Sequence, residues 1–295
     1  MNADAVALVG PTASGKSALA LAIAERVGAP IIACDSMQVY VGLDIGTAKP
    51  TPAERARVPH MMIDVCTLPD RFSAQRWADE ARRWIAYWRA RGRVPLIVGG
   101  TGLYLRALVE GLSEIPAEDP EVHKTLIARA REEGTPRLHA ELARVDPETA
   151  ARLHPNDTQR VVRALSVYLS SGKPISHWQK RRARPRASVE VFVLELEAEA
   201  LRARIRARFA AMLKAGWWEE VKWLAQAAVP DTHPAVRAVG YRQLLRAVRN
   251  EIPEAQAIEA GIAATWQYAK RQRTWFAYQT RAAMRGPAAK IAPEI

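Results

Sequence analysis

A glycine-rich segment near the start of the chain constrains the possible folds more than any other feature. It fits the pattern G-x-x-x-x-G-K-[ST] and consists of Gly10, Pro11, Thr12, Ala13, Ser14, Gly15, Lys16 and Ser17. An apolar run at residues 5–9 precedes it, and a run rich in Ala, Leu and Ile with helical spacing follows at residues 18–27. A strand, a glycine loop and a helix in this order form the context in which the pattern marks a phosphate-binding loop. The alternative, a chance glycine-rich turn, does not explain both flanks.

The residues of this loop are suited to binding a polyphosphate. Glycines let backbone amides turn inward and surround phosphate oxygens at the start of a helix. Lys16 would place a positive charge on the terminal phosphates, and the Ser17 hydroxyl would ligate Mg²⁺. The loop by itself leaves open whether the polyphosphate is a nucleotide or another compound.

Apolar runs that alternate with helical segments predict a doubly wound parallel sheet in the first third of the chain. The strands are expected at residues 5–9, 30–34, 61–65 and 94–98. Ser73 is a candidate N-cap for a helix that runs to about Arg91. The predicted fold class is α/β, with a P-loop NTPase-like parallel sheet flanked by helices and an all-helical insertion domain.

The helical insertion is predicted from a change of pattern after Gly111. Residues 116–180 show only helical periodicity, and a run with five basic residues, Lys180–Arg186, closes the segment. A strand at 189–196 is expected to return to the sheet. Helices are then predicted at 198–215, 217–228, 235–249 and 253–285, with a loose tail after Gly286. We therefore predict a core of residues 1–115 plus 188–295 and an insertion domain of residues 116–187.

The balance of charge points to a polyanionic partner. The net charge is +12 over 295 residues, and nucleic acid is the first candidate partner. An arginine-rich solvated surface is the alternative, and charge alone does not separate the two. Cys34 and Cys66 are the only cysteines, too few for a disulfide framework or a zinc site. No run reaches transmembrane length, and the chain enters its first strand almost directly. We therefore expect no signal peptide and no membrane partner, and predict a cytoplasmic protein.

Asp35 is the first candidate catalytic residue. It ends the predicted strand at 30–34, where a parallel sheet presents residues to a ligand. A carboxylate there can accept a proton from a nucleophile or hold Mg²⁺ through water. The alternative is an aspartate that caps a helix or a turn, but Ser36, Gln38 and Tyr40 beside it favour a functional role.

Thr101 is the second candidate catalytic residue. It lies in a glycine turn after the strand at 94–98, where its hydroxyl could orient a substrate amine. The glycines of this turn, Gly99, Gly100 and Gly102, would let a bulky ligand approach the backbone. A simple helix N-cap is the alternative, and it is compatible with the functional role.

Other polar residues carry weaker signals. Asp64 follows an apolar run and could equally support the site or the structure. Arg204 and Arg208 are four residues apart and share a helix face, on which an arginine could neutralise a leaving pyrophosphate. Gln159, Arg160 and Arg163, on a helix that Asp157 could cap, can contact bases and phosphates or form a solvated face. Aromatic residues among Lys and Arg in the last helix could stack on nucleotides or pack the core, and the six histidines show no metal-ligand spacing.

Taken together, the motifs resemble those of bacterial tRNA dimethylallyltransferases, which prenylate an adenosine next to the anticodon. The matching segments span nearly the whole chain in the right order. They are the loop Gly10–Ser17, Asp35–Tyr40, Gly46–Pro50, Gly99–Tyr104, Asn156-Asp157 with Gln159-Arg160, Gly172–Pro174, Val239–Tyr241 and Tyr268–Gln272. One departure is Glu197-Ala198 before the arginine-rich helix, where members of the family often carry Asp-Arg. We also find no C-terminal Cys/His zinc module of the kind seen in eukaryotic relatives.

The resemblance implies a role for each part of the site. The loop would hold the pyrophosphate of dimethylallyl diphosphate, with Mg²⁺, Lys16 and Arg208 stabilising it as it leaves. Asp35 would be the general base toward the adenine N6 amine, and Thr101 would be bonded to that amine. The implied tRNA contacts are Asp35, Ser36, Met37, Gln38, Thr101, His123, Gln159, Arg160, Val161, Val162, Arg163, Gly240, Tyr241, Arg242, Gln243, Leu244 and Leu245.

The resulting prediction is a Mg²⁺-dependent, monomeric tRNA dimethylallyltransferase. We expect the helical insertion to bind the anticodon stem-loop and the target base to be flipped into a channel between sheet domain and insertion. A small-molecule P-loop kinase is the first alternative, but it explains neither the charge nor the basic insertion. A nucleotide-gated RNA-binding protein is the second, but it leaves Asp35 and Thr101 without a function.

Overall fold

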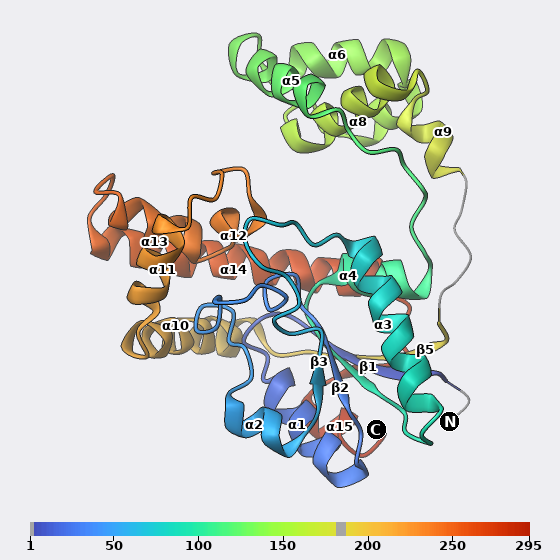
Figure 1. The fold of residues 1–295 in the computed structure, drawn as a ribbon, viewed down its shortest axis with the longest axis vertical. Helices are drawn as coiled ribbons and strands as arrows, with labels where there is room; N and C mark the ends of the chain where they lie inside the picture. Colours follow the sequence, from blue (N-terminus) through green and yellow to red (C-terminus); the bar gives the residue numbers. More distant parts are fainter. Residues whose placement is uncertain (1–2, 181–186) are drawn as a thin grey trace. The chain divides into compact units, whose positions relative to one another are not determined.

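The computed structural model describes residues 3–180 and 187–295 and divides into two compact units (Figure 1). The sheet unit comprises Met1–Val109 with Pro185–Ile295, and the helical unit comprises Glu110–Arg184. The boundaries predicted from the sequence, 116 and 187, fall a few residues after these. Most of the basic run singled out in the sequence, Arg181–Arg186, lies outside the described residues.

A parallel sheet forms the centre of the sheet unit, as predicted. In the described chain it has six strands in the order β3-β2-β4-β1-β5-β6, and every neighbouring pair is parallel. The strands are β1 (Ala5–Val9), β2 (Ile31–Cys34), β3 (His60–Met61), β4 (Leu96–Gly99), β5 (Val189–Leu194) and β6 (Met284–Gly286). Val9 and Cys34 are both register partners of Gly99. The residues that follow these three strands therefore emerge at one edge of the sheet.

Helices cover both faces of the sheet because the central strands are apolar on both sides. On one face α1 (Lys16–Val27) and α15 (Ala288–Ile291) pack on Val6, Leu8 and Leu96, and Figure 1 shows these two helices close together. On the other face lie α3 (Ala74–Arg89), whose N-cap is Ser73 as predicted, and α4 (Gly102–Val109). Trp77 of α3 donates a hydrogen bond to the Ala33 carbonyl oxygen at 2.9 Å and fixes α3 to β2.

The remaining helices of the sheet unit lie in its second half, apart from one short helix after β2. They are α2 (Pro52–Arg57), α10 (Ala198–Lys214), α11 (Trp217–Gln226), α12 (Pro234–Arg237), α13 (Tyr241–Val248) and α14 (Glu254–Tyr278). The single helix predicted at 235–249 is wrong, because the chain breaks between α12 and α13. Gly240 has a φ of +87° there, and a Cβ on it would lie 2.2 Å from the Trp217 ring.

Three further predictions about elements are corrected. The strand expected at 61–65 ends at Met61, because Met62 and Asp64 have φ values of +65° and +55°, which a strand does not allow. The last long helix ends at Tyr278 rather than at 285, and residues 284–286 form β6 beside β5. The tail after Gly286 is not loose, since it forms α15 and buries Ile291 completely in the core.

The helical unit contains helices and no strands within its described residues, 110–180. The helices are α5 (Pro120–Glu132), α6 (Thr135–Val145), α7 (Pro147–Arg152), α8 (Thr158–Ser171) and α9 (Ile175–Gln179). Asp157 caps α8 as predicted, accepting a hydrogen bond from the Arg160 backbone N–H at 3.2 Å. An apolar core that includes Leu138, Val161 and Leu165 holds the helices together. No helix in residues 3–180 or 187–295 combines the length and apolarity needed to cross a membrane.

Candidate active site

The predicted phosphate loop lies between β1 and α1, as the sequence pattern requires. Its backbone uses the left-handed conformation at Ala13 (φ +63°) and Gly15 (φ +93°), which turns successive amides. Gly10 has no room for a side chain, because a Cβ would lie 2.6 Å from the Leu194 carbonyl oxygen. Lys16 is the first residue of α1, and its Nζ donates a hydrogen bond to the Pro11 carbonyl oxygen at 3.2 Å.

A cavity of about 1280 Å³ in the sheet unit gathers most of the predicted site. It is lined by Thr12–Ser17 of the loop without Ser14, Asp35–Gln38, residues 44–52, Arg208 and Tyr268, among others. The loop and the Asp35 segment follow β1 and β2, whose ends lie at the same edge of the sheet. The register of the sheet therefore explains why residues distant in the sequence line one cavity.

Asp35 forms a turn and also lines the cavity. Its Oδ1 accepts hydrogen bonds from the backbone N–H of Met37 at 2.8 Å and of Gln38 at 3.4 Å. Asp35 therefore caps a turn, as the alternative interpretation of this residue proposed. Its carboxylate nevertheless borders the cavity. Its predicted role as a base stays a prediction.

Thr101 joins the ends of β2 and β4. Its backbone N–H donates to the Cys34 carbonyl oxygen at 3.1 Å, and its hydroxyl accepts from the Ser36 backbone N–H at 3.0 Å. Burial raises the pKa of Tyr268, which also lines the cavity. Thr101 is therefore fixed to the residues that follow β2, as an orienting hydroxyl must be.

The glycines around Thr101 are needed for the protein's own packing, and Gly99 also lines the cavity. A Cβ on Gly99 would lie 2.0 Å from the Cys34 carbonyl oxygen. On Gly102 a Cβ would lie 2.0 Å from Trp275 Nε1, and on Gly100 it would lie 2.3 Å from Gln272 Nε2. Backbone and α14 side chains thus fill the space beside these glycines, and the approach of a ligand to them stays a prediction.

Gln272 is a residue whose role sequence reasoning missed. This buried side chain of α14 accepts a hydrogen bond from the Thr12 backbone N–H at 2.8 Å and donates one to the Gly100 carbonyl oxygen at 2.8 Å. It therefore ties the phosphate loop to the Thr101 turn. The only sequence signal was its place in the segment Tyr268–Gln272, which matches the resembled family.

The basic groups at the loop come from α1 and α10. Enclosure by the protein and the nearby charge of Arg208 lower the pKa of Lys16 to about 8, although Asp35 and Cys34 act in the opposite direction. Burial likewise lowers the pKa of Arg208, which Asp35 partly offsets. Arg204 donates a hydrogen bond to the Ser14 carbonyl oxygen at 3.1 Å. The prediction that Arg204 and Arg208 share a face is confirmed, and that face is turned toward the loop.

A magnesium site made only of protein carboxylates is absent from the described residues. No group of three or more His, Cys, Asp or Glu side chains in them could hold a metal. Asp64, one candidate, is engaged by Lys49 at 2.6 Å and Arg55 at 2.8 Å. The Ser17 hydroxyl and Asp35 both line the cavity, and this donor set suits an ion that takes its other ligands from phosphate oxygens and water.

Several of the predicted tRNA contacts have buried side chains. Val161 and Val162 are fully buried in the helical unit, so their side chains cannot contact RNA. The side chains of Gln243, Leu244 and Leu245 are buried in the sheet unit, and Gly240 has no side chain. Tyr241 is also buried, but it lines the cavity. The spacing of a helix exposes only part of each predicted segment.

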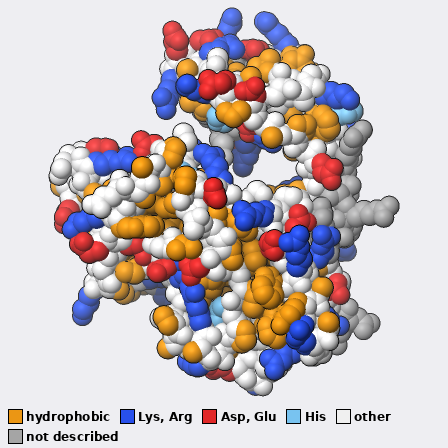
Figure 2. Space-filling model, in the orientation of Figure 1, with side chains coloured by type: hydrophobic (Ala, Val, Ile, Leu, Met, Phe, Trp, Pro, Cys, Tyr) orange, Lys and Arg blue, Asp and Glu red, His pale blue; other side chains and the backbone are white. Residues whose placement is uncertain are grey.

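The predicted contacts with accessible side chains are fewer. Gln159, Arg160 and Arg242 are exposed. His123 and Arg163 are half-buried, and both contact the carboxylate of Glu118, at 2.5 Å and 2.6 Å. On the face drawn in Figure 2, Lys and Arg side chains lie over each unit among acidic ones rather than in one continuous stripe.

The sheet and the loop define a P-loop-type α/β protein, and comparison with known proteins narrows the class further. The family model for IPP transferase matches residues 38–279. The chain is 48% identical over 284 residues to the tRNA dimethylallyltransferase of Halorhodospira halophila, covering 95% of this chain and 92% of the relative. The tRNA dimethylallyltransferase of Methylibium petroleiphilum is also 48% identical, over 92% of this chain and 86% of that protein.

Solved structures agree with this likeness. The crystal structure of a tRNA isopentenylpyrophosphate transferase from Bacillus halodurans has a TM-score of 0.68 and 34% identity, covering 98% of this chain and 93% of that one. A eukaryotic dimethylallyltransferase acting on tRNA has a TM-score of 0.73 and 27% identity, covering 92% of this chain and 69% of that one. The chain belongs to the IPP transferase family, and the resemblance drawn from its motifs is confirmed.

Proposed function

We propose that the protein transfers a dimethylallyl group from dimethylallyl diphosphate to the N6 amine of the adenosine 3′-adjacent to the anticodon in tRNA, and releases pyrophosphate. The observation that carries the proposal is that one cavity is lined by both a phosphate loop and Asp35, with Thr101 bonded to the Asp35 turn. The family membership and the high identity to proteins named tRNA dimethylallyltransferase support it.

The loop end of the cavity supplies the charge that the leaving group needs. As the allylic C–O bond breaks, negative charge grows on the departing pyrophosphate. Lys16, Arg208 and residues of the loop line the cavity, and we expect them to stabilise that charge. Mg²⁺ held by Ser17 and the diphosphate oxygens would neutralise part of the same charge.

Asp35, which lines the cavity, and Thr101, which is bonded to the Asp35 turn, would act on the amine. The adenine amine is a poor nucleophile, because its lone pair is delocalised into the ring. The Thr101 hydroxyl would orient the amine toward the allylic carbon, and the C–N bond forms there. The Asp35 carboxylate would accept the proton that the nitrogen loses.

A base in a stacked anticodon loop has to leave its stack to enter such a site. Exposed Gln159, Arg160 and Arg242 are suited to contacts with the tRNA backbone or bases. We propose that the protein acts as a monomer. With tRNA as its substrate, we expect it to act in the cytoplasm.

The test is an incubation with unmodified tRNA, Mg²⁺ and dimethylallyl diphosphate, followed by nucleoside mass spectrometry. We expect a prenyl mass gain on adenosine in the absence of ATP. If adenosine is unchanged, and a parallel incubation with ATP in place of the diphosphate shows ATP hydrolysis, the loop serves a nucleotide and the kinase or RNA-binding alternative replaces this proposal.

A further inference from the structure

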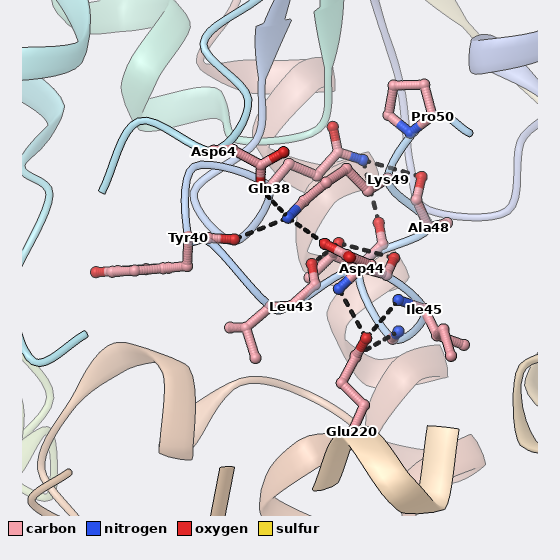
Figure 3. Close-up of polar contacts among 12 residues, drawn as sticks. Gln38, Tyr40, Leu43, Asp44, Ile45, Ala48, Lys49, Pro50, Asp64 and Glu220 are labelled. Atoms are coloured by element: carbon pink, nitrogen blue, oxygen red, sulfur yellow. Dashed lines mark hydrogen bonds and ion pairs between the residues drawn. The ribbon is translucent and has the colours of Figure 1, made fainter. Parts of the chain in front are cut away.

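Residues 44–49, which we call the wall segment, line the cavity and are held by a carboxylate from a distant helix. Figure 3 shows Glu220 of α11 pointing at this segment. Its Oε2 accepts hydrogen bonds from the backbone N–H of Asp44 at 2.8 Å and of Ile45 at 2.7 Å, and its Oε1 accepts from that of Gly46 at 3.0 Å. The three amides form an anion-binding nest that the protein fills itself.

The same carboxylate connects two helices to the wall segment. Glu220 Oε1 also accepts a hydrogen bond from the Tyr241 hydroxyl of α13. The backbone of the wall segment approaches these helices closely, since a Cβ on Gly46 would lie 2.0 Å from Trp217 Nε1 and 2.6 Å from the Tyr241 ring. Glu220 is thus the polar centre of a tightly packed junction between the wall segment and the C-terminal helices.

The wall segment is in turn bonded to the Asp35 turn. Gln38 Nε2 donates hydrogen bonds to the carbonyl oxygens of Thr47 and Ala48, both at 3.1 Å. The Gln38 backbone N–H is one of the two N–H groups that donate hydrogen bonds to Asp35 Oδ1. An unbroken series of contacts therefore runs from Glu220 through residues 44–48 and Gln38 to the Asp35 carboxylate.

A second anchor holds the wall segment from the side of the sheet. The side chain of Lys49 is 1% exposed and donates to the Tyr40 carbonyl oxygen at 2.8 Å. It also contacts Asp44 at 2.5 Å and Asp64 at 2.6 Å, as Figure 3 shows. Burial alone would raise the pKa of Asp64, but Lys49 and Arg55 hold it below its ordinary value. Asp64, which the sequence left undecided, supports the structure here.

We infer that Glu220 is a positioning residue for the reaction: by filling the nest of the wall segment, it fixes Gln38 and the Asp35 turn in the geometry that accepts the amine proton. This inference rests on the proposed function. The Lys49 anchor keeps the wall segment folded, while Glu220 sets its distance from the C-terminal helices. Losing Glu220 should therefore disturb the geometry of the turn more than the stability of the protein.

The test compares E220Q with E219Q. Glutamine has one acceptor oxygen, and its NH₂ would face backbone donors. Glu219 lies next in the chain, is exposed and pairs with Lys222, so E219Q removes the same charge without touching the wall segment. We expect E220Q to lower the single-turnover prenylation rate about tenfold at saturating substrates while leaving the Kd for pyrophosphate within about twofold. E219Q should match the wild type.

Two readouts separate positioning from a general structural loss. In the Q38A background, E220Q should lower the rate by less than about threefold, because the connecting residue is already gone. Amide exchange in E220Q should accelerate at residues 44–46 and at Met37 and Gln38, with no change in E219Q. Additive rate effects, or acceleration confined to residues 44–46, would overturn the inference.

Further variants and readouts keep the test decisive. If E220Q does not fold, Y241F removes one donor to Glu220 without a change of charge, and we expect a loss of about threefold with the same pattern. An unchanged rate in Y241F would then overturn the inference. If the wild type itself fails to prenylate tRNA, the proposed function is wrong, and amide exchange in E220Q still tests the contact series.

Discussion

Two segments of the sheet unit have the backbone geometry of an anion-binding nest, and they differ in whether a protein carboxylate fills it. The loop Gly10–Ser17 turns toward the cavity with Lys16 beside it. The wall segment gives its N–H groups to Glu220, which the chain itself supplies. We interpret the first as the site of a substrate diphosphate and the second as a support for the fold. The comparison teaches that a backbone nest is a candidate binding site only where no protein carboxylate already fills it.

The largest effect should come from Asp35, whose turn is bonded to the wall segment through Gln38. Asp35→Ala should lower the single-turnover rate by roughly 10²–10⁴, because the amine proton loses its acceptor. Affinity for tRNA should stay nearly intact, measured by filter binding. If affinity collapses while single-turnover chemistry survives, Asp35 is a binding residue and the wall segment does not support catalysis.

The loop should show its own dependence on pH. The pKa of Lys16 lies at about 8, so the side chain is a cation below that pH and neutral above it. The value of kcat/KM for the diphosphate donor should be flat below this pH and fall about tenfold per pH unit above it. Steady-state kinetics from pH 6.5 to 10 measure this profile. K16R keeps the charge and should remove the fall; a wild-type profile flat to pH 10 would contradict the assignment.

A variant of Gln272 tests how the phosphate loop itself is held in place. Q272A leaves the Thr12 N–H and the Gly100 carbonyl oxygen without their partner, which should cost about 2 kcal/mol in the free energy of unfolding. Loss of loop geometry should also lower kcat/KM for the donor about tenfold. Gln267 lies exposed on the same helix, so Q267A is the matched control. Equal effects of both changes on urea unfolding and kinetics would refute a specific link.

The smallest effect concerns the helical unit. Arg160 is exposed, and R160A should weaken tRNA binding about threefold and reduce the salt slope by about one. V162A, two positions on, should lower the free energy of unfolding by about 1.5 kcal/mol and leave the salt slope unchanged, because Val162 is fully buried. A reduced slope in V162A alone would place the RNA elsewhere on this unit.

The sequence predicted what local patterns determine. The loop, the Asp35 turn, the Asp157 cap and the shared face of Arg204 and Arg208 each follow from residues close together in the chain. The contacts of Gln272 with Gly100 and of Glu220 with the wall segment join residues 172 to 176 positions apart, and no local pattern reports them.

Local sequence patterns also could not predict the short elements. β6 has three residues and is a strand only because β5 pairs with it. The burial of Val161 and Leu244 follows from which face of each helix meets its own core, so a matched motif could not separate exposed from buried members. Sequence motifs thus found the segments of the site more reliably than the individual side chains that can contact RNA.

The comparison of the two segments is tested most directly by calorimetric titration of Mg²⁺-pyrophosphate into the wild type, K16A and E220Q. If the loop holds the diphosphate and Glu220 fills the other nest, K16A should weaken binding about 10- to 100-fold. E220Q should bind with an affinity within about twofold of the wild type. An affinity for pyrophosphate that K16A leaves unchanged, or a loss of pyrophosphate binding in E220Q, would contradict the account.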